Sequence, residues 1–311
     1  MNVRRESLEM ERTMTHDHTG SIPVLAVTGH SLAEAWESSL LSLWVYGCSI
    51  RTQYDQKDAN GEWLHPPSVD CTMMMTVVDP SSEPSIHRAF PGGLADLEEY
   101  RQEVVDGIKD HWVRSDEDVD GTKWEYTYHE RLANYRSVDN LERKPFNDVD
   151  QLETMVQQLA KSPISRRCNA VTWQPWKDND CDDPPCLQSI WCRILPDKDD
   201  VWHLNMNVRF RSRDAYDAAF MNMWAFVALQ ESLAKRVSER AEREVKLGHY
   251  CDLSDSYHIY GRRQEHFENG FLKLVETRSF EDRTWTREFA ESFFEEARPG
   301  IVEKVRRQDS K

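Results

Sequence analysis

The sequence predicts a single domain of the α/β or α+β class. Segments with helical periodicity and segments with strand periodicity follow one another along the chain, without an internal repeat. The 311 residues suit one large domain or two small ones, and 39% hydrophobic residues with 11 tryptophans are enough for a packed core. We expect this domain to span residues 23–300, between a flexible tail at 1–22 and a frayed end at 301–311.

The first half of the domain is expected to contain three helices and one buried strand. Ser31, followed by Glu34, forms a capping-box pattern at the start of a helix that Gly47 can end. The apolar residues of this helix share one face: Leu32, Trp36, Leu40, Leu43 and Trp44. The other segments are expected as a strand at 71–78, helices at 94–112 and 149–160, and a surface loop at 113–123.

Strands dominate the second half of the domain. The clearest is WHLNMNVRFR, in which apolar residues alternate with polar ones, so that the polar set shares one face. Its apolar set is Trp202, Leu204, Met206, Val208 and Phe210. The other segments are expected as strands at 169–176, 188–195 and 257–261, a long helix at 216–243, and a helix within the last 30 residues.

The charge and the cysteine content exclude several classes of protein. A net charge of −16 repels nucleic-acid backbones and acidic membrane surfaces, so we expect neither as a partner. The N-terminus lacks the apolar core of a signal peptide, and no apolar run reaches the roughly 18 residues that span a bilayer. We therefore expect a soluble cytoplasmic protein whose seven cysteines are free thiols.

Cys186 is the cysteine whose surroundings point to chemistry. It lies in the segment PPCLQ, where two prolines stiffen a polar loop as it enters a strand. A free cysteine is more often a buried structural residue. Cys168, Cys181 and Cys192 lack the setting of Cys186, and we interpret them as structural or exposed. A zinc site of Cys181, Cys186, Cys192 and His203 would have unusual spacings, so we expect no metal.

Arginines and a serine form a candidate phosphate site. Arg166 and Arg167 lie in a helix-to-strand connection, and Arg211 with Ser212 ends the clearest strand. Guanidinium groups bind phosphate through paired hydrogen bonds and lower the pKa of a neighbouring thiol. The alternative is structural, because paired arginines favour a helix C-terminus and Asp214 can cap the following helix.

Three further polar residues could contact a nucleotide. Asn222 lies among large apolar residues inside a helix, which is unfavourable for asparagine unless it is buried or lines a pocket. Its carboxamide can donate and accept side by side, as the edge of a pyrimidine requires. His258 and Tyr260 share one strand face and could bind a ribose hydroxyl; a histidine satisfied in the core is the alternative.

These motifs together resemble the thymidylate synthase family. SRRCNAVTWQP, PPCLQ, RFRSRD, Asn222 and YHIYG occur in the order and spacing of that family, over roughly residues 120–262. WEYTYHERLANY at 124–135 and GHSLAEAWESSL are closest to its archaeal type. The resemblance implies an α+β domain with a large mixed β-sheet flanked by helices, and a homodimer formed through the sheet.

The resemblance also implies a role for each matching residue. Cys186 would be the nucleophile that adds to carbon 6 of the pyrimidine, and Tyr128 would help to remove the proton from carbon 5. Arg211 and Ser212 would hold the 5′-phosphate, which Arg166 and Arg167 would reach from the partner subunit. The other implied substrate contacts are Asp214 for the nucleotide and the folate, Asn222 for the base, His258 and Tyr260 for the sugar 3′-hydroxyl, and Gln188 next to the cysteine.

Two family residues have more than one candidate here. The catalytic glutamate would be Glu98 or Glu99, and the N-terminal phosphate arginine would be Arg51 or Arg88.

The implied reaction uses methylenetetrahydrofolate as co-substrate and no metal. Addition of the thiolate makes carbon 5 of the ring nucleophilic, and a positioned base then removes its proton. Hydride from the folate would give a methyl group, whereas water would give a hydroxymethyl group. Because both reactions start from the same adduct, exclusion of water decides the product.

Three departures from the family pattern affect that choice. Leu187 stands where many bacterial members have histidine, as the archaeal type permits, and Asp217 is an unfamiliar charge near the base. The C-terminal IVEKVRRQDSK does not resemble the apolar tail that closes over the folate, which favours hydroxymethylation. Asn222 is typical of a uracil site.

The leading hypothesis is therefore conversion of deoxyuridylate to thymidylate. The alternative is hydroxymethylation of CMP, dCMP or dUMP, and a third hypothesis is a regulatory nucleotide-binding relative without turnover.

Overall fold

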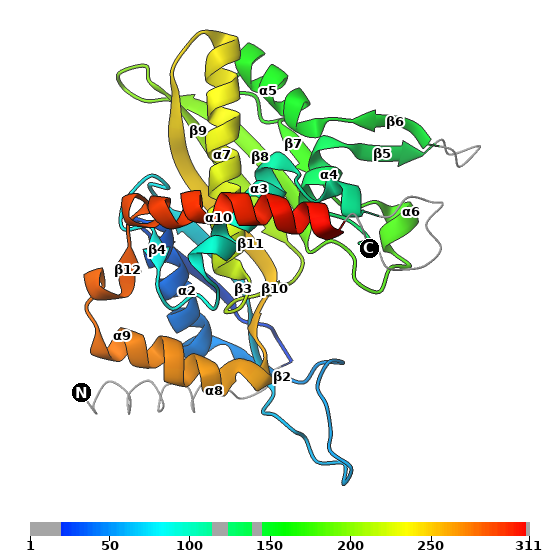
Figure 1. Ribbon diagram of the computed structural model, residues 1–311, viewed down its shortest axis with the longest axis vertical. Helices are drawn as coiled ribbons and strands as arrows, with labels where there is room; N and C mark the ends of the chain where they lie inside the picture. Colours follow the sequence, from blue (N-terminus) through cyan, green and yellow to red (C-terminus); the bar gives the residue numbers. More distant parts are fainter. Residues whose placement is uncertain (1–19, 114–123, 139–144, 309–311) are drawn as a thin grey trace. The chain divides into compact units, whose positions relative to one another are not determined.

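The computed structural model describes residues 20–113, 124–138 and 145–308 (Figure 1). The chain divides into two compact units, each assembled from three separate stretches. Unit 1 comprises the residues up to 92 together with 210–220 and 251–289, and unit 2 comprises 93–209, 221–250 and the residues from 290. Most of the expected N-terminal tail and of the loop at 113–123 lies outside the described residues.

The strands form an eight-stranded mixed sheet, which confirms the expected α+β fold. The order is β1-β3-β11-β9-β8-β7, with β2 on β3 and β10 on β11. β1 pairs with β3 in parallel and β7 pairs with β8 antiparallel. The bounds are β1 Val24–Gly29, β2 Cys48–Ile50, β3 Ser68–Val77, β7 Asn169–Val171, β8 Leu187–Pro196, β9 Trp202–Phe210, β10 Arg213–Asp214 and β11 Val245–Ile259.

In unit 1, helix α2 (Leu32–Tyr46) begins where its capping residues predict. The Ser31 hydroxyl accepts a hydrogen bond from the Glu34 N–H (3.4 Å), and the Glu34 carboxylate accepts one from the His30 N–H (2.6 Å). The helix ends at Gly47. Trp36 is fully buried, and its indole N–H donates to the Ala215 carbonyl oxygen (3.0 Å). This bond fastens α2 to the turn after β10.

The remaining elements of unit 1 are short. The two-stranded β4–β12 pair is antiparallel, and the helical turns from Gly261 to Thr277 follow β11 without a break. The bounds are β4 Ile86–His87, η2 Gly261–Arg263, α8 Gln264–Phe267, η3 Glu268–Leu272, α9 Lys273–Thr277, η4 Glu281–Arg283 and β12 Thr284–Trp285.

In unit 2, the alternating pattern of β9 is confirmed: Leu204, Met206 and Val208 are buried, and the residues between them are more exposed. Residues of α5 (Gln151–Lys161) and β8 complete this core: Leu152, Met155, Val156, Leu159, Ile190, Cys192 and Ile194. The other elements are α3 Leu94–Asp106, η1 Asp110–Trp112, α4 Tyr128–Ala133, β5 Tyr135–Val138, β6 Pro145–Val149, α6 Pro175–Asp178, α7 Ala219–Ala241 and α10 Arg287–Gln308.

Several segments differ from expectation. The short strand expected at 257–261 is the end of a longer one, β11, which runs from Val245 to Ile259. The strand expected at 169–176 ends at Val171, because Pro175 begins helix α6. Helix α10 continues to Gln308, through part of the segment that the sequence predicts as frayed. Lys304 on this helix pairs with Glu99 of α3 (2.8 Å), which holds the last turns. None of the described helices combines the length and the apolar character needed to cross a bilayer.

Candidate active site

Cys186 and Tyr128, the two residues assigned to the chemistry, lie near one another in unit 2. Cys186 is half-buried and directly precedes β8, whereas Tyr128 is the first residue of α4. Burial raises the pKa of the Tyr128 hydroxyl well above its usual value, and Tyr100, Tyr126 and Cys186 act in the same direction. A hydrogen bond from the Leu187 backbone opposes them. The tyrosine hydroxyl is therefore held, protonated, beside the residue that follows the thiol.

Asn222 joins this group through Tyr100. Asn222 lies on α7 and is 9% exposed, and its amide nitrogen donates to the Tyr100 hydroxyl (2.7 Å). The prediction that Asn222 is buried or lines a pocket is consistent with this exposure. The bond fixes one end of the carboxamide, so its orientation is set by the protein.

A cavity of about 440 Å³ adjoins Tyr128. It is lined by Tyr100, Glu103, Trp124, Glu125, Tyr126, Thr127, Tyr128 and Asp183. Aromatic side chains and carboxylates thus line the same cavity. Burial raises the pKa of Glu103, although its ion pair with Lys109 (2.9 Å) opposes the shift. Glu103 therefore holds a proton more readily than an ordinary glutamate.

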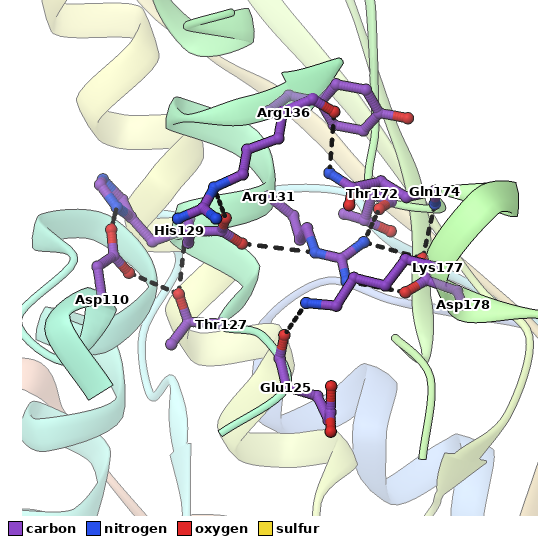
Figure 2. A network of polar contacts seen from close by, with 12 residues as sticks. Asp110, Glu125, Thr127, His129, Arg131, Arg136, Thr172, Gln174, Lys177 and Asp178 are labelled. Carbon is purple, nitrogen blue, oxygen red and sulfur yellow. Dashed lines mark hydrogen bonds and ion pairs between the residues drawn. The ribbon is translucent and has the colours of Figure 1, made fainter. Parts of the chain in front are cut away.

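A buried arginine fixes the elements that carry Tyr128 and Cys186 (Figure 2). The Arg131 guanidinium, which is 1% exposed, makes two 2.8 Å hydrogen bonds to Asp178 and one of 2.9 Å to the Thr172 carbonyl oxygen. The Thr172 hydroxyl in turn donates to the Leu187 carbonyl oxygen. Because Arg131 belongs to α4 and Leu187 begins β8, the network links the two backbones that position the tyrosine and the thiol.

Glu125, which lines the cavity, is held by a hydrogen bond from a residue beside the Arg131 network. Lys177 donates to the Glu125 carbonyl oxygen (2.9 Å), and the Gln174 N–H donates to Asp178 (2.6 Å). Figure 2 shows Lys177 reaching toward Glu125 below the Arg131 guanidinium.

Glu98 and Glu99, the two candidates for the family glutamate, are both held in ion pairs on α3. Glu98 is buried and accepts from Arg101 (3.0 Å), Gln102 (2.8 Å) and Arg298 (3.0 Å). Burial opposes ionisation of Glu98, but these hydrogen bonds outweigh it and lower its pKa. Glu99 pairs with Lys109 and Lys304 and likewise has a lowered pKa. The cavity is lined instead by Glu103, one helical turn further on.

A second group of predicted residues lies in unit 1, on β10, β11 and the turn after β9. Arg211 and Ser212 are half-buried. Strands β10 and β11 are parallel, and in their register Asp214 lies opposite His258. The Asp214 carboxylate accepts from the N–H groups of Tyr216 (3.0 Å) and Asp217 (2.8 Å), which lie in the turn before α7. Because α7 begins only at Ala219, Asp214 closes this turn and does not cap the helix, as the structural alternative had expected. Burial raises the pKa of Asp214 to about 6.

His258 lies on β11 and Tyr260 directly follows the strand, which ends at Ile259, and the two rings contact one another. Their ring centroids lie 4.6 Å apart, and His258 is 7% exposed. Asp217, the charge singled out as unfamiliar, pairs with Arg263 (2.7 Å).

The remaining predicted arginines lie on exposed surfaces. Arg166 and Arg167 occupy the loop between α5 and β7, and within the described residues neither guanidinium forms an ion pair. Arg51 donates to the His65 carbonyl oxygen (2.7 Å) and lies over the Trp63 ring. Arg88 donates to the Asp282 carbonyl oxygen (2.7 Å).

The last predicted residues are Gln188, next to Cys186, and the members of the alternative zinc site. The Gln188 amide donates to the Pro185 carbonyl oxygen (2.9 Å), so it braces the segment around Cys186. Cys192 is buried in the sheet, and burial raises its pKa well above the usual value. His203 bonds to Asp197 (3.1 Å). Over the described parts of the chain, no cluster of three or more metal-ligating side chains occurs.

Sequence analysis missed several residues of the site, among them Tyr100, Glu103 and Arg131. It also did not single out other residues that line the cavity, among them Trp124, Glu125, Tyr126 and Asp183. Tyr100 and Glu103 lie three apart in an expected helix, so a shared face could have been inferred, but nothing indicated that this face lines a cavity. Arg131 lies inside WEYTYHERLANY, and a buried arginine is recognised only when its partner is known.

Comparison with known proteins assigns this arrangement to a family. A sequence profile described as thymidylate synthase matches residues 94–281. A protein of Methanosarcina acetivorans named "Putative thymidylate synthase" is 27% identical over 246 residues, covering 78% of this chain and 93% of the relative. A protein of the same name from Methanococcoides burtonii is 28% identical over 250 residues, covering 79% and 93%.

Solved structures support the same fold. The thermostable thymidylate synthase A of Bacillus subtilis is similar with a TM-score of 0.54 and 18% identity, covering 80% of this chain and 85% of that one.

The fold and the matched segments define a one-carbon transferase that acts on pyrimidines. The chain belongs to the thymidylate synthase family.

Proposed function

We propose that this protein transfers a one-carbon unit from methylenetetrahydrofolate to carbon 5 of a pyrimidine nucleoside 5′-monophosphate, through an adduct of Cys186 at carbon 6. The observation that carries the proposal is the half-buried thiol beside the buried hydroxyl of Tyr128. The Cys186 thiolate would add to the ring, and Tyr128 would assist removal of the proton from carbon 5. Membership of the family supplies the reaction class.

The first form of the reaction that we propose is conversion of dUMP to dTMP. Asn222 supports it, because a carboxamide held by Tyr100 can still present its oxygen to the N–H group of a uracil edge. The names of the archaeal relatives point to the same reaction in those proteins.

The second form is hydroxymethylation of CMP, dCMP or dUMP, and the composition of the cavity favours it. Glu103, Glu125 and Asp183 line the cavity next to Tyr128, and carboxylates retain water. Glu103, with its raised pKa, is suited to accept a proton from that water. Water that reaches the exocyclic methylene would yield the hydroxymethyl product.

The remaining assignments complete the proposal. We propose that Arg211 and Ser212 bind the 5′-phosphate, and that Arg166 and Arg167 reach it from the partner subunit of a cytoplasmic homodimer. We propose that either Glu98 or Glu99 is the family glutamate, and that either Arg51 or Arg88 is the N-terminal arginine that contacts the phosphate. Trp124 and Tyr126 offer faces on which the pterin ring could stack, and Glu125 could accept its N–H groups.

Product mass separates the two forms. The protein is incubated with methylenetetrahydrofolate and each of dUMP, dCMP, UMP and CMP, and products are identified by mass spectrometry. Methyl product with dihydrofolate supports the first form, and hydroxymethyl product with tetrahydrofolate supports the second. Cys186→Ser should abolish both, whereas Cys181→Ser, a nearby half-buried thiol, should retain activity. Absence of any product from all four nucleotides would refute the proposal.

A further inference from the structure

The strand face that carries His258 also carries a chain of hydrogen bonds that ends at an unpartnered nitrogen. The Ser256 hydroxyl donates to the Asp70 carboxylate (2.8 Å), and its oxygen lies 3.2 Å from His258 Nδ1. His258 Nε2 is buried, and no described residue forms a hydrogen bond with it. All three residues belong to unit 1, Asp70 on β3 and the other two on β11.

The proton positions follow from the number of hydrogens available. A serine hydroxyl has one hydrogen, and here it is directed to Asp70, which as a carboxylate can only accept. The Ser256 oxygen must then accept from His258, so Nδ1 carries the ring proton. A neutral imidazole has one N–H, so Nε2 is left with a lone pair.

The ring is neutral at ordinary pH. Burial lowers the pKa of His258 to about 4, so no second proton occupies Nε2. A buried acceptor without a partner is unfavourable unless a ligand supplies a donor.

We propose that Asp70 and Ser256 are positioning residues that fix the tautomer of His258, so that Nε2 accepts a hydrogen bond from a hydroxyl of the nucleotide sugar. The proposal rests on the proposed function, because it takes the ligand to be a nucleotide. It adds a requirement: the sugar must present a hydroxyl hydrogen to this atom, and two residues remote from the ligand enforce it.

The first test is the tautomer itself, observed without ligand. In protein labelled with ¹⁵N-histidine, the ring nitrogens of His258 are assigned by comparison with His258→Gln. We expect the wild type to show a protonated Nδ1. Asp70→Asn should move the proton to Nε2, because the new amide donates to Ser256 and turns its hydroxyl toward Nδ1. A wild-type ring protonated at Nε2 would overturn the proposal, whatever the protein binds.

The second test is the discrimination between dUMP and 2′,3′-dideoxyuridylate, measured by calorimetry. One neutral hydrogen bond should make the wild type bind dUMP roughly two- to tenfold more tightly. Ser256→Ala should lose this preference, and Ser256→Thr, which keeps the hydroxyl, should retain it. A purely structural role predicts instead that Ser256→Ala weakens both nucleotides equally. If the wild type binds neither nucleotide, the proposed function fails, and the spectrum alone decides the tautomer.

Discussion

Burial controls the ionisation of single residues in each of the two units. Tyr128 is kept protonated in unit 2, whereas in unit 1 burial raises the pKa of Asp70 to about 6 in spite of the Ser256 hydrogen bond. Such residues were only partly visible in the sequence. Cys186 and Asn222 were found because their neighbours are unusual, but Asp70 lies in an apolar strand segment and has no local signal.

Asp70 should make stability depend on pH. Its folded-state pKa is above the usual value, so its contribution is fully present below about pH 4 and is lost as pH rises through about 6. The difference amounts to about 3 kcal/mol at most. Asp70→Asn avoids this loss, so the stability of the variant relative to the wild type should rise by up to that amount between pH 4.5 and 7.5. Urea denaturation at both values measures it.

The matched control for Asp70 is Asp182→Asn, at an exposed loop position. Its stability relative to the wild type should not change between the two pH values. If the stability of Asp70→Asn relative to the wild type is the same at pH 4.5 and pH 7.5, the raised pKa of Asp70 is contradicted.

Tyr128 should act on a step after nucleophilic addition. Tyr128→Phe removes the hydroxyl and should lower kcat by about 100-fold, with a smaller effect on KM. Tyr46→Phe, at an exposed position on α2, should leave both constants unchanged. Steady-state kinetics with the active nucleotide test this, and full activity of Tyr128→Phe would exclude the assigned role.

At the scale of elements, helices and strands were predicted best where their sequence pattern is strongest. α2 and β9 were located because caps or strict alternation define them. β7 was predicted too long, since a proline after a short strand can begin a helix as well as continue an extended segment. The hydrogen-bond network of Arg131 was not predictable, because its partners Thr172 and Asp178 lie 41 and 47 residues further along the chain.

The Arg131–Asp178 pair should be strongly coupled. Both side chains are 1% exposed, so removing either partner leaves a buried charge and should cost about 3–5 kcal/mol. Arg131→Ala combined with Asp178→Ala should cost less than the sum of the single variants. Arg236→Ala, which breaks a half-exposed pair with Glu153, should cost less than about 1 kcal/mol. Urea denaturation gives all values, and additive losses at the buried pair would disprove the coupling.

At the scale of the whole molecule, each compact unit is assembled from three stretches of the chain. The sequence patterns predict one domain over residues 23–300, but local patterns cannot reveal which distant segments pack together in each unit. The ordered motifs nevertheless identified the fold, because they report on a family and not on local structure. The proposed phosphate and sugar contacts of Arg211, Ser212 and His258 fall in unit 1, and Cys186 and Tyr128 fall in unit 2.

The proposed homodimer with shared sites predicts complementation between inactive variants. Cys186→Ser and the double variant Arg166→Ala/Arg167→Ala should each be nearly inactive. If the arginines serve the partner's thiol, random mixing of the two should restore roughly a quarter of the sites. Activity after subunit exchange measures this, and sedimentation checks the dimer. No recovery in a mixture that has exchanged subunits would place the arginines outside the shared site.

The central claim is that the Cys186 sulfur bonds to carbon 6 of the pyrimidine, and intact-protein mass spectrometry of the acid-quenched reaction tests it most directly. During turnover, we expect a population heavier by the mass of the nucleotide, with the added mass on the peptide that contains Cys186 and absent from Cys186→Ser. Turnover without any adduct, or an adduct on another cysteine, would contradict the account.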